Sequence, residues 1–342
     1  MIASNPSRIL IARMSAIGDT ILTLPVACAL RAKFPDAFLA WVVEEKSAAM
    51  VVNHACLDEV LVLKRGWFTH PGRLLATRRL LRARRFDVTI DCQGMTKSAL
   101  ACWLSGARRR IGLRGAHGRE LSPWLNNERI PSERPHVVDR SLDLLAPLGI
   151  QQPAVRWQLP LDDDSRQRMG EVIDRLELSG GYAVMNPGAT WQSRRWEMDR
   201  FGRVAQHLGA QHSLPTLVVW GGAGERAAAE QIVAESAGHA VLAPPTTLFE
   251  LAALIEGGRL FLSADTGPLH MAVAVGTPSI GLYGTTRPEE SGPYGSSHAA
   301  LQAEYQSGSH RQRRHADNRA MRLISAEMVC RQCDAMLTSC RE

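Results

Sequence analysis

The sequence predicts an α/β protein made of two domains, each with a parallel sheet covered by helices. Three observations predict this fold class. The chain has 342 residues, more than one domain usually holds. Short apolar runs rich in β-branched residues alternate with segments of helical spacing, as in parallel sheets buried on both faces. A polar connector, PLDDDS at residues 160–165, separates two such series.

The first series begins with the apolar run RILIAR at residues 8–13, which is a predicted strand. A turn containing Gly18 follows, and then a segment of helical spacing that stops at Pro35. Further strands are predicted at 38–43, 59–63 and 87–91. Between and after them, residues 74–85 form a basic amphipathic helix and residues 98–106 another helix.

The second series repeats the alternation without a repeat of fixed period. Strands are predicted at 182–185, 216–220, 259–263 and 279–283, with helices after the connector, at 200–208, from Arg226, at 249–255, through Ala274 and at 325–337. The stretch 286–320 is rich in Gly, Ser, His and Arg and is predicted to be loop. In parallel sheets ligands bind beyond the carboxyl ends of the strands, so the polar loops there are the candidate site.

Composition excludes several classes of protein. Hydrophobic residues make up 45% and charged residues 22%, which is ordinary globular usage. No apolar run approaches the roughly 20 residues of a membrane helix, and the first segment does not have the pattern of an export signal. We therefore expect a cytoplasmic protein. The seven cysteines are odd in number and scattered, which predicts reduced thiols.

The positive charge is concentrated in the first half of the chain. Residues 1–150 hold 22 Lys and Arg against 13 Asp and Glu, an excess of +9, which leaves 18 against 21, or −3, for the rest. This asymmetry predicts an anionic partner for the first half: nucleic acid, a phosphorylated glycan or a membrane surface. The alternative is a solvated basic face without a partner.

The loop after the first strand, Ser15–Thr20, contains Gly18 and Asp19. Gly18 permits a tight turn with close backbone approach. Asp19 falls at a helix start, where it could cap free N–H groups or accept a proton from an incoming hydroxyl, and position alone leaves both roles open. The loop is not a dinucleotide fingerprint, because GxGxxG is absent.

Three loops of the second half have the composition of a site for a phosphorylated ligand. Residues 186–190 are a small-residue turn ending in Thr190, followed closely by Arg194. Glu225 follows the glycines of GGAGE and could accept from sugar hydroxyls or simply cap its helix. Residues 265–267, Asp-Thr-Gly, precede a helix whose N–H groups would face a bound anion, while His270 is expected to be a packed rather than a catalytic histidine.

Taken together, the motifs resemble those of the bacterial ADP-heptose:lipopolysaccharide heptosyltransferases, glycosyltransferase family 9. The resemblance rests on RILIARMSAIGDT, FDVTIDCQGMTKSAL, NPGA with RRW, GGAGE and ADTGPLHMAVAVGTPSIGLYG, and covers nearly the whole chain. It implies a GT-B fold, in which two Rossmann-like domains face a central cleft. An acceptor-binding domain would span 1–160 and a nucleotide-sugar-binding domain 161–322, with a last helix at 323–342 returning to the first domain. It also implies inversion at the anomeric carbon without a metal or other cofactor.

The resemblance further implies a role for each site residue. Asp19 matches the general base. Thr266 and Gly267 match the loop that holds the donor diphosphate, Asp265 the residue that holds the heptose hydroxyls, and Glu225 the acidic residue on the ribose. Arg194 stands where the family usually has a lysine that contacts the diphosphate, and Glu197 where it usually has proline; Arg194 keeps the charge but changes the geometry. Residues 307–315 match no family pattern.

The basic first half adds an expected acceptor and membrane surface. We expect Lys64, Arg65 and Gly18 to bind a lipopolysaccharide precursor as acceptor. The arginines of 73–85 would contact an anionic inner leaflet, while Leu74, Leu75, Leu80 and Leu81 pack on the sheet. A monomer without nucleic-acid binding is expected. Cys330, Cys333 and Cys340 contain one C-x-x-C pair where a structural zinc site usually needs two, so no metal is expected there.

The rival hypotheses are a non-catalytic nucleotide-sugar or glycan-binding protein on the same fold, a nucleic-acid binder, and a family 9 transferase that uses another sugar. The basic segment lacks a nucleic-acid motif and interleaved aromatic residues, which argues against the second.

Overall fold

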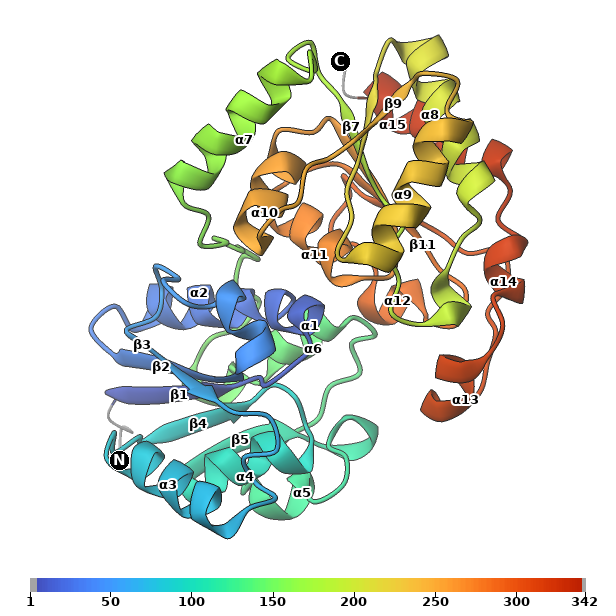
Figure 1. Cartoon of the computed structure of the whole chain (residues 1–342). Coiled ribbons are helices and arrows are strands. Elements are labelled where there is room, and N and C mark those ends of the chain that lie inside the picture. Colours follow the sequence, from blue (N-terminus) through green and yellow to red (C-terminus); the bar gives the residue numbers. More distant parts are fainter. Residues whose placement is uncertain (1–4, 340–342) are drawn as a thin grey trace. The chain divides into compact units, whose positions relative to one another are not determined.

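The computed structural model describes residues 5–339, which form two compact units that divide between Pro160 and Leu161. This division lies in the polar connector at residues 160–165. Each unit holds a six-stranded sheet in which all pairings between described strands are parallel (Figure 1). The prediction of an α/β protein with two parallel sheets is confirmed.

The first sheet has the strand order β3-β2-β1-β4-β5-β6, and helices lie on both of its faces (Figure 1). Its strands are β1 Arg8–Ala12, β2 Phe38–Glu44, β3 Glu59–Leu63, β4 Val88–Asp91, β5 Arg109–Leu113 and β6 Glu128–Ile130. Its helices are α1 Ile17–Ile21, α2 Leu24–Lys33, α3 Pro71–Arg82, α4 Thr96–Leu104, α5 Ser122–Leu125 and α6 Val137–Asp143.

The second sheet has the order β12-β11-β10-β7-β8-β9. Its strands are β7 Ala183–Asn186, β8 Thr216–Val218, β9 Ala240–Leu242, β10 Leu260–Ala264, β11 Ser279–Leu282 and β12 Ala299–Leu301. Its helices are α7 Asp163–Arg175, α8 Met198–His212, α9 Ala223–Glu235, α10 Leu248–Glu256, α11 Gly267–Ala274, α12 Pro288–Ser291, α13 His310–His315, α14 Arg319–Arg322 and α15 Ala326–Ser339.

The buried cores explain why these elements pack as they do. In the first unit, strand residues such as Leu10 and Val42 pack with Leu81 of α3 and Cys102 of α4. In the second unit, one apolar cluster joins the sheet to α8, α9 and α15. The strand interiors are apolar on both faces because helices cover both, which is the reason their sequences read as continuous apolar runs.

Two segments differ from the secondary structure predicted for them. The segment predicted as one helix up to Pro35 is divided into α1 and α2, because Pro25 lies in the first turn of α2 and begins a new helix there. Gly18 is buried inside α1 rather than in a turn. The stretch 286–320 is not all loop: it contains α12, β12, α13 and α14, and β12 pairs with β11.

The last helix packs within the second unit. Val329, Cys333 and Leu337 of α15 are buried in the apolar cluster that includes α8. This placement corrects the expectation that 323–342 returns to the first domain. The physical reason is the apolar face of α15, which is covered by α8 and the second sheet.

The basic helix α3 packs on the sheet through a narrower face than expected. Thr77 and Leu81 are buried, and Leu74 and Leu80 are partly buried against the same core. Leu75 is 45% exposed, so the expectation that it packs on the sheet is wrong. Positions 74, 77 and 81 follow the spacing of one helix face, and position 75 lies about 100° away from it.

Candidate active site

In the first unit, Asp19 is held at the carboxyl end of β1 by two contacts. Arg13 Nη2 lies 2.9 Å from Asp19 Oδ1, and Ala16 N donates to Asp19 Oδ2 at 3.2 Å. Asp19 is thus the third residue of α1 and satisfies an N–H at the helix start. Its side chain is nevertheless 45% exposed, whereas that of Arg13 is 7% exposed. Because each carboxylate oxygen can accept a second hydrogen bond, Asp19 combines the capping role with an accessible acceptor.

A second charged pair lies beside this loop. Lys97 Nζ lies 2.9 Å from Glu44 Oε2 and donates to Ser15 Oγ at 2.7 Å. Glu44 ends β2 and Lys97 is the second residue of α4, so the pair connects the loop after β1 to the neighbouring strand β2 and to the helix after β4. Both side chains are less than one-fifth exposed. These residues were not predicted from the sequence.

Lys64 and Arg65 are exposed and follow β3 at the same edge of the sheet. Leu63 on β3 is the register partner of Glu44 on β2. Lys64 is the next residue after Leu63, so it leaves the sheet beside Glu44. Just after α3, the guanidinium of Arg84 lies 2.6 Å from Glu59 Oε1 and is half-buried. The other arginines of the helix and its C-terminal flank are exposed (Arg73, Arg78, Arg79, Arg82, Arg85).

In the second unit, Arg194 and Asp265 form a largely buried pair. Arg194 Nη2 lies 3.2 Å from Asp265 Oδ2, and Arg194 Nη1 donates to the carbonyl oxygen of Asp265 at 2.9 Å. The guanidinium also stacks on the ring of Trp191 at 4.1 Å. Among the residues that the structure describes, Arg194 Nε is buried and has no partner. The arginine is therefore fixed in place and retains an unused donor.

His270 contacts the same carboxylate: its Nε2 lies 3.6 Å from Asp265 Oδ1, and both side chains are buried. Burial by itself would raise the pKa of Asp265, but the hydrogen bond from His270 and the charge of Arg194 outweigh it and hold that pKa below its ordinary value. Asp265 is thus a carboxylate at neutral pH, buried between two partners.

Thr266 precedes α11 and lies in a group of hydroxyl and amide side chains. Its Oγ1 is 3.0 Å from Ser263 Oγ, and Asn186 Nδ2 donates to Thr266 Oγ1 at 3.3 Å and to Ser263 Oγ at 3.0 Å. Gly267 is the first residue of α11. Neighbouring strands β7 and β10 thus bring the predicted turns at 186 and 265 together, at a helix start suited to an anion.

Glu225 lies at the end of the loop that follows β8. It is the third residue of α9, and Gly221 N donates to Glu225 Oε2 at 2.8 Å. A Cβ placed on Gly188 would lie 2.5 Å from the carboxylate carbon of Glu225, so the loops after β7 and β8 are in close contact. Thr190 is exposed on the first of these loops. The structure therefore brings all the predicted donor-side residues to the carboxyl ends of β7, β8 and β10.

The segment that matched no family pattern also contacts this edge. The ring of His310 lies 5.1 Å from that of Trp191, edge to face. Ser193 Oγ donates to the carbonyl oxygen of Arg313 at 2.7 Å. Helix α13 thus supports the turn that carries Arg194.

The C-x-x-C pair does not form a metal site in the described residues. Cys333 is buried in the apolar core, and burial raises the pKa of Cys330 to about 11. Cys340 lies outside the described residues. The described side chains that do converge like metal ligands are His207, His212 and Asp334.

Of the site residues that the sequence did not single out, Arg13 directly follows β1, Glu44 ends β2, and Lys97 lies in the first turn of α4 after the loop that follows β4. That position is a usable signal, because the carboxyl ends of parallel strands share one edge. The sequence does not show which of these residues form ion pairs with one another.

Comparison with known proteins decides the family. A model described as glycosyltransferase family 9 (heptosyltransferase) matches residues 74–320. The chain belongs to this family. It is therefore a glycosyltransferase enzyme, as the sequence motifs predicted.

Individual family members are similar over most of their length. Lipopolysaccharide heptosyltransferase 1 of Salmonella typhimurium is 28% identical over 303 residues, 86% of this chain and 93% of that protein. Lipopolysaccharide heptosyltransferase 3 of Escherichia coli is 28% identical over 276 residues, 79% of this chain and 80% of that protein. The solved E. coli heptosyltransferase WaaC with ADP-2-deoxy-2-fluoro heptose has a TM-score of 0.76 at 24% identity, covering 96% of this chain and 99% of its own. The GT-B fold is thereby confirmed.

Proposed function

We propose that this family 9 enzyme transfers a heptose from ADP-heptose to a sugar of the lipopolysaccharide inner core, with inversion and without a catalytic metal ion. The observation that carries the proposal is the second unit's Arg194–Asp265 pair beside the start of α11. A fixed guanidinium, a hydroxyl and a helix start together are suited to a diphosphate. The names of the relatives support heptose and lipopolysaccharide as the substrate classes.

The exposed carboxylate of Asp19 is the proposed general base. It takes the proton of the acceptor hydroxyl as the hydroxyl oxygen forms a bond to the anomeric carbon. The bond between that carbon and the diphosphate oxygen breaks, and its electron pair leaves with ADP. Arg13 acts as a positioning residue, because its contact at 2.9 Å holds the Asp19 carboxylate at the end of β1.

The leaving ADP is stabilised on the other unit. Arg194, the hydroxyl of Thr266 and the backbone N–H of Gly267 would face the charge that grows on the diphosphate. Asp265 holds Arg194 in place and accepts from heptose hydroxyls. Glu225 accepts from the ribose, and Thr190 lines the same loop edge.

The direct test is ADP release from ADP-heptose by the purified chain, with and without an inner-core acceptor that lacks heptose. We expect ADP only when acceptor is present, a product of inverted anomeric configuration, and an unchanged rate after chelator treatment. Binding of ADP-heptose without turnover would instead establish a binding protein. A panel of other nucleotide sugars checks the donor, since faster release from another sugar would replace heptose in the proposal.

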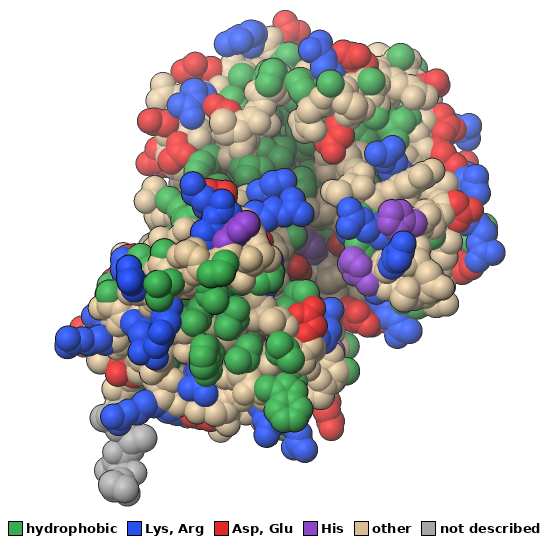
Figure 2. Space-filling view, turned by 60° about the horizontal axis from the view of Figure 1, so that its bottom comes forward, with side chains coloured by type: hydrophobic (Ala, Val, Ile, Leu, Met, Phe, Trp, Pro, Cys, Tyr) green, Lys and Arg blue, Asp and Glu red, His purple; other side chains and the backbone are tan. Residues whose placement is uncertain are grey.

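We also propose that the first unit lies on the anionic inner leaflet and that Lys64 and Arg65 contact the acceptor. Among residues 5–339, no helix combines the length and apolar composition that crossing a membrane requires. Trp103, Leu121 and Trp124 of the first unit are 51%, 56% and 84% exposed. Apolar and basic side chains lie next to one another on the face of this unit seen in Figure 2. Exposed tryptophan beside arginine is typical of a membrane interface.

Glutamine at Arg78, Arg79 and Arg82 tests this surface. Each exposed arginine near an anionic bilayer is worth about 1 kcal/mol, so the triple variant should bind anionic vesicles roughly 100-fold more weakly at low salt. Its ADP affinity should equal that of the parent. Absence of vesicle binding by the parent at low salt would contradict the membrane proposal and leave the acceptor proposal to Lys64 and Arg65.

A further inference from the structure

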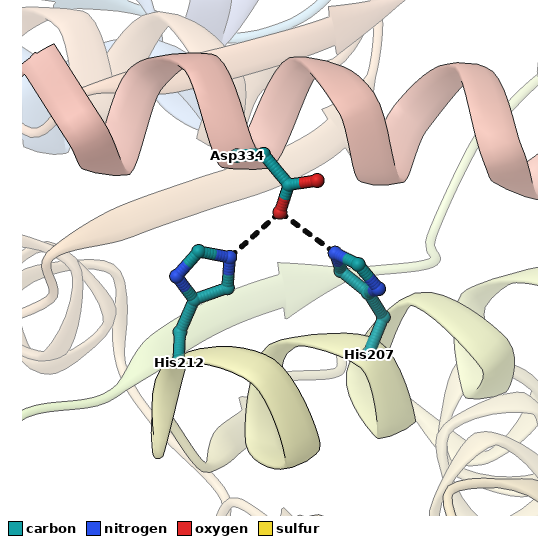
Figure 3. A group of neighbouring side chains, drawn as sticks. All are labelled: His207, His212 and Asp334. Atoms are coloured by element: carbon teal, nitrogen blue, oxygen red, sulfur yellow. Dashed lines mark hydrogen bonds and ion pairs between the residues drawn. The ribbon is translucent and has the colours of Figure 1, made fainter.

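Two histidines and one aspartate converge between helices α8 and α15, and none of them belongs to the donor-binding or acceptor-binding residues proposed above. Figure 3 shows His207 and His212 on α8 pointing to one carboxylate oxygen of Asp334 on α15. The His207 Nε2 to Asp334 Oδ1 distance is 2.7 Å, and that of His212 Nε2 is 2.6 Å. The ligand atoms of the three residues all lie within 4.8 Å of one another.

From this convergence we propose that His207, His212 and Asp334 bind a divalent transition-metal ion, zinc in the first instance, which fastens α15 to α8. Two imidazole nitrogens and a carboxylate oxygen are a ligand set that Zn²⁺ and Fe²⁺ accept, with water at the remaining positions. Three protein ligands leave a position to water, but none of the three belongs to the proposed transfer site, so the role proposed for the ion is to hold α15 against α8.

The geometry needs only a small adjustment to admit the ion. At metal–ligand distances of about 2.0–2.1 Å, neighbouring ligand atoms of a tetrahedral site lie about 3.3 Å apart. The present separations of 2.6 and 2.7 Å must therefore widen by about 0.7 Å, which side-chain rotation provides. The side chains of His207, His212 and Asp334 are 26%, 17% and 44% exposed, so an ion and its water ligands can enter.

The surroundings favour a cation. His212 is the last residue of α8, and the carbonyl end of a helix stabilises positive charge. Of the cationic side chains on the two helices near the cluster, Arg203 on α8 is paired with Asp199 at 3.3 Å. Arg331, three residues before Asp334 on α15, is exposed and donates to the carbonyl oxygen of Glu327 at 3.3 Å. A carboxylate and two neutral imidazoles are the ligand forms that the ion would bind.

The position of this cluster in the fold indicates which property of the protein the ion would affect. In a parallel sheet the helices run opposite to the strands, so the end of α8 lies at the amino edge of the sheet, whereas the donor loops lie at the carboxyl edge. His207 is the tenth residue of a 15-residue helix that begins beside Arg194, roughly 14 Å along its axis. The ion would therefore stabilise the docking of α15 and leave the affinity for ADP unchanged.

The test is calorimetric titration of Zn²⁺ into the full chain, free of any affinity tag and previously treated with chelator. We expect one saturable equivalent in the parent and a rise in its unfolding temperature with added Zn²⁺. The His207→Gln and His212→Gln variants should lose both effects while keeping the ADP affinity of the parent, which shows that they are folded. His315→Gln, which removes an exposed histidine of the same unit, should behave like the parent.

Equal zinc binding by the parent and the His207→Gln/His212→Gln double variant would overturn the proposal. Co²⁺ provides a second readout of the ligand set. Its visible d–d bands should appear without a thiolate charge-transfer band. A thiolate band would replace this ligand set with one containing Cys330, which lies one turn before Asp334 on α15.

Discussion

Each unit places an aspartate–arginine pair at the carboxyl edge of its sheet, and the two pairs differ in their exposure. In the first unit, Asp19 is 45% exposed and Arg13 is 7% exposed. In the second, Asp265 is 7% exposed and Arg194 is 20% exposed. The pair of the first unit therefore presents its carboxylate to solvent, whereas in the pair of the second unit the guanidinium is the more exposed partner. This difference in exposure, rather than the residue types, is the basis for proposing that the first unit supplies the base and the second the diphosphate contact.

The largest expected effect is on turnover. Asp19→Asn keeps the size of the side chain and its ability to cap α1 but removes the base, so kcat should fall by about 10²–10⁴-fold. Asp36→Asn changes another exposed aspartate of the first unit and should leave kcat unaltered. Near-parental turnover by Asp19→Asn would exclude Asp19 as the base.

The second expected effect is on the free energy of unfolding, which should fall by different amounts when each of the two aspartate–arginine pairs is broken. Asp265→Asn leaves a mostly buried guanidinium without its carboxylate, which costs about 3–5 kcal/mol of unfolding free energy. Asp19→Asn also leaves a buried guanidinium, that of Arg13, but water reaches the exposed side of this pair and Arg13 keeps its hydrogen bond to the carbonyl oxygen of Cys92, so the loss should be smaller. Urea denaturation of both variants measures the difference. Equal losses would show that exposure does not separate the two pairs.

The smallest effect concerns the contact between two donor loops. In Gly188→Ala the new methyl group meets the Glu225 carboxylate and displaces it. Loss of one hydrogen bond, about 0.5–1.5 kcal/mol, should raise the KM for ADP-heptose roughly two- to twelvefold. Gly180→Ala is the matched control, because a Cβ there meets no atom within 4 Å. An unchanged KM would remove Glu225 from the donor site.

Strands with a sustained apolar run were predictable, whatever their final length. Strands β1 and β2 contain apolar runs of four and six residues, and the three-residue β8 lies within the strand predicted at 216–220, whereas β5 begins with two arginines and was not predicted. Strands β6, β9 and β12 have three residues each and lie at sheet edges, where pairing with a neighbour rather than their own composition makes them strands. The sequence also did not show which unit α15 packs against, because an apolar helix face does not specify the surface that covers it.

The site shows the same division. The sequence predicted that Asp19, Glu225 and Asp265 follow strands, because the motif and the strand signal are local. It did not predict the Lys97–Glu44 pair, whose members are 53 residues apart. That pairing depends on the order of strands in the sheet.

Calorimetric titration of ADP into Asp19→Asn and Arg194→Ala tests whether the second unit, and not the first, binds the diphosphate. We expect Asp19→Asn to bind ADP with the affinity of the parent. Arg194→Ala loses a charge-assisted contact worth about 1.5–3 kcal/mol, so its ADP dissociation constant should rise roughly 10–150-fold. Unchanged ADP affinity in Arg194→Ala, or weakened ADP affinity in Asp19→Asn, would contradict the proposal that the second unit binds the diphosphate and the first supplies the base.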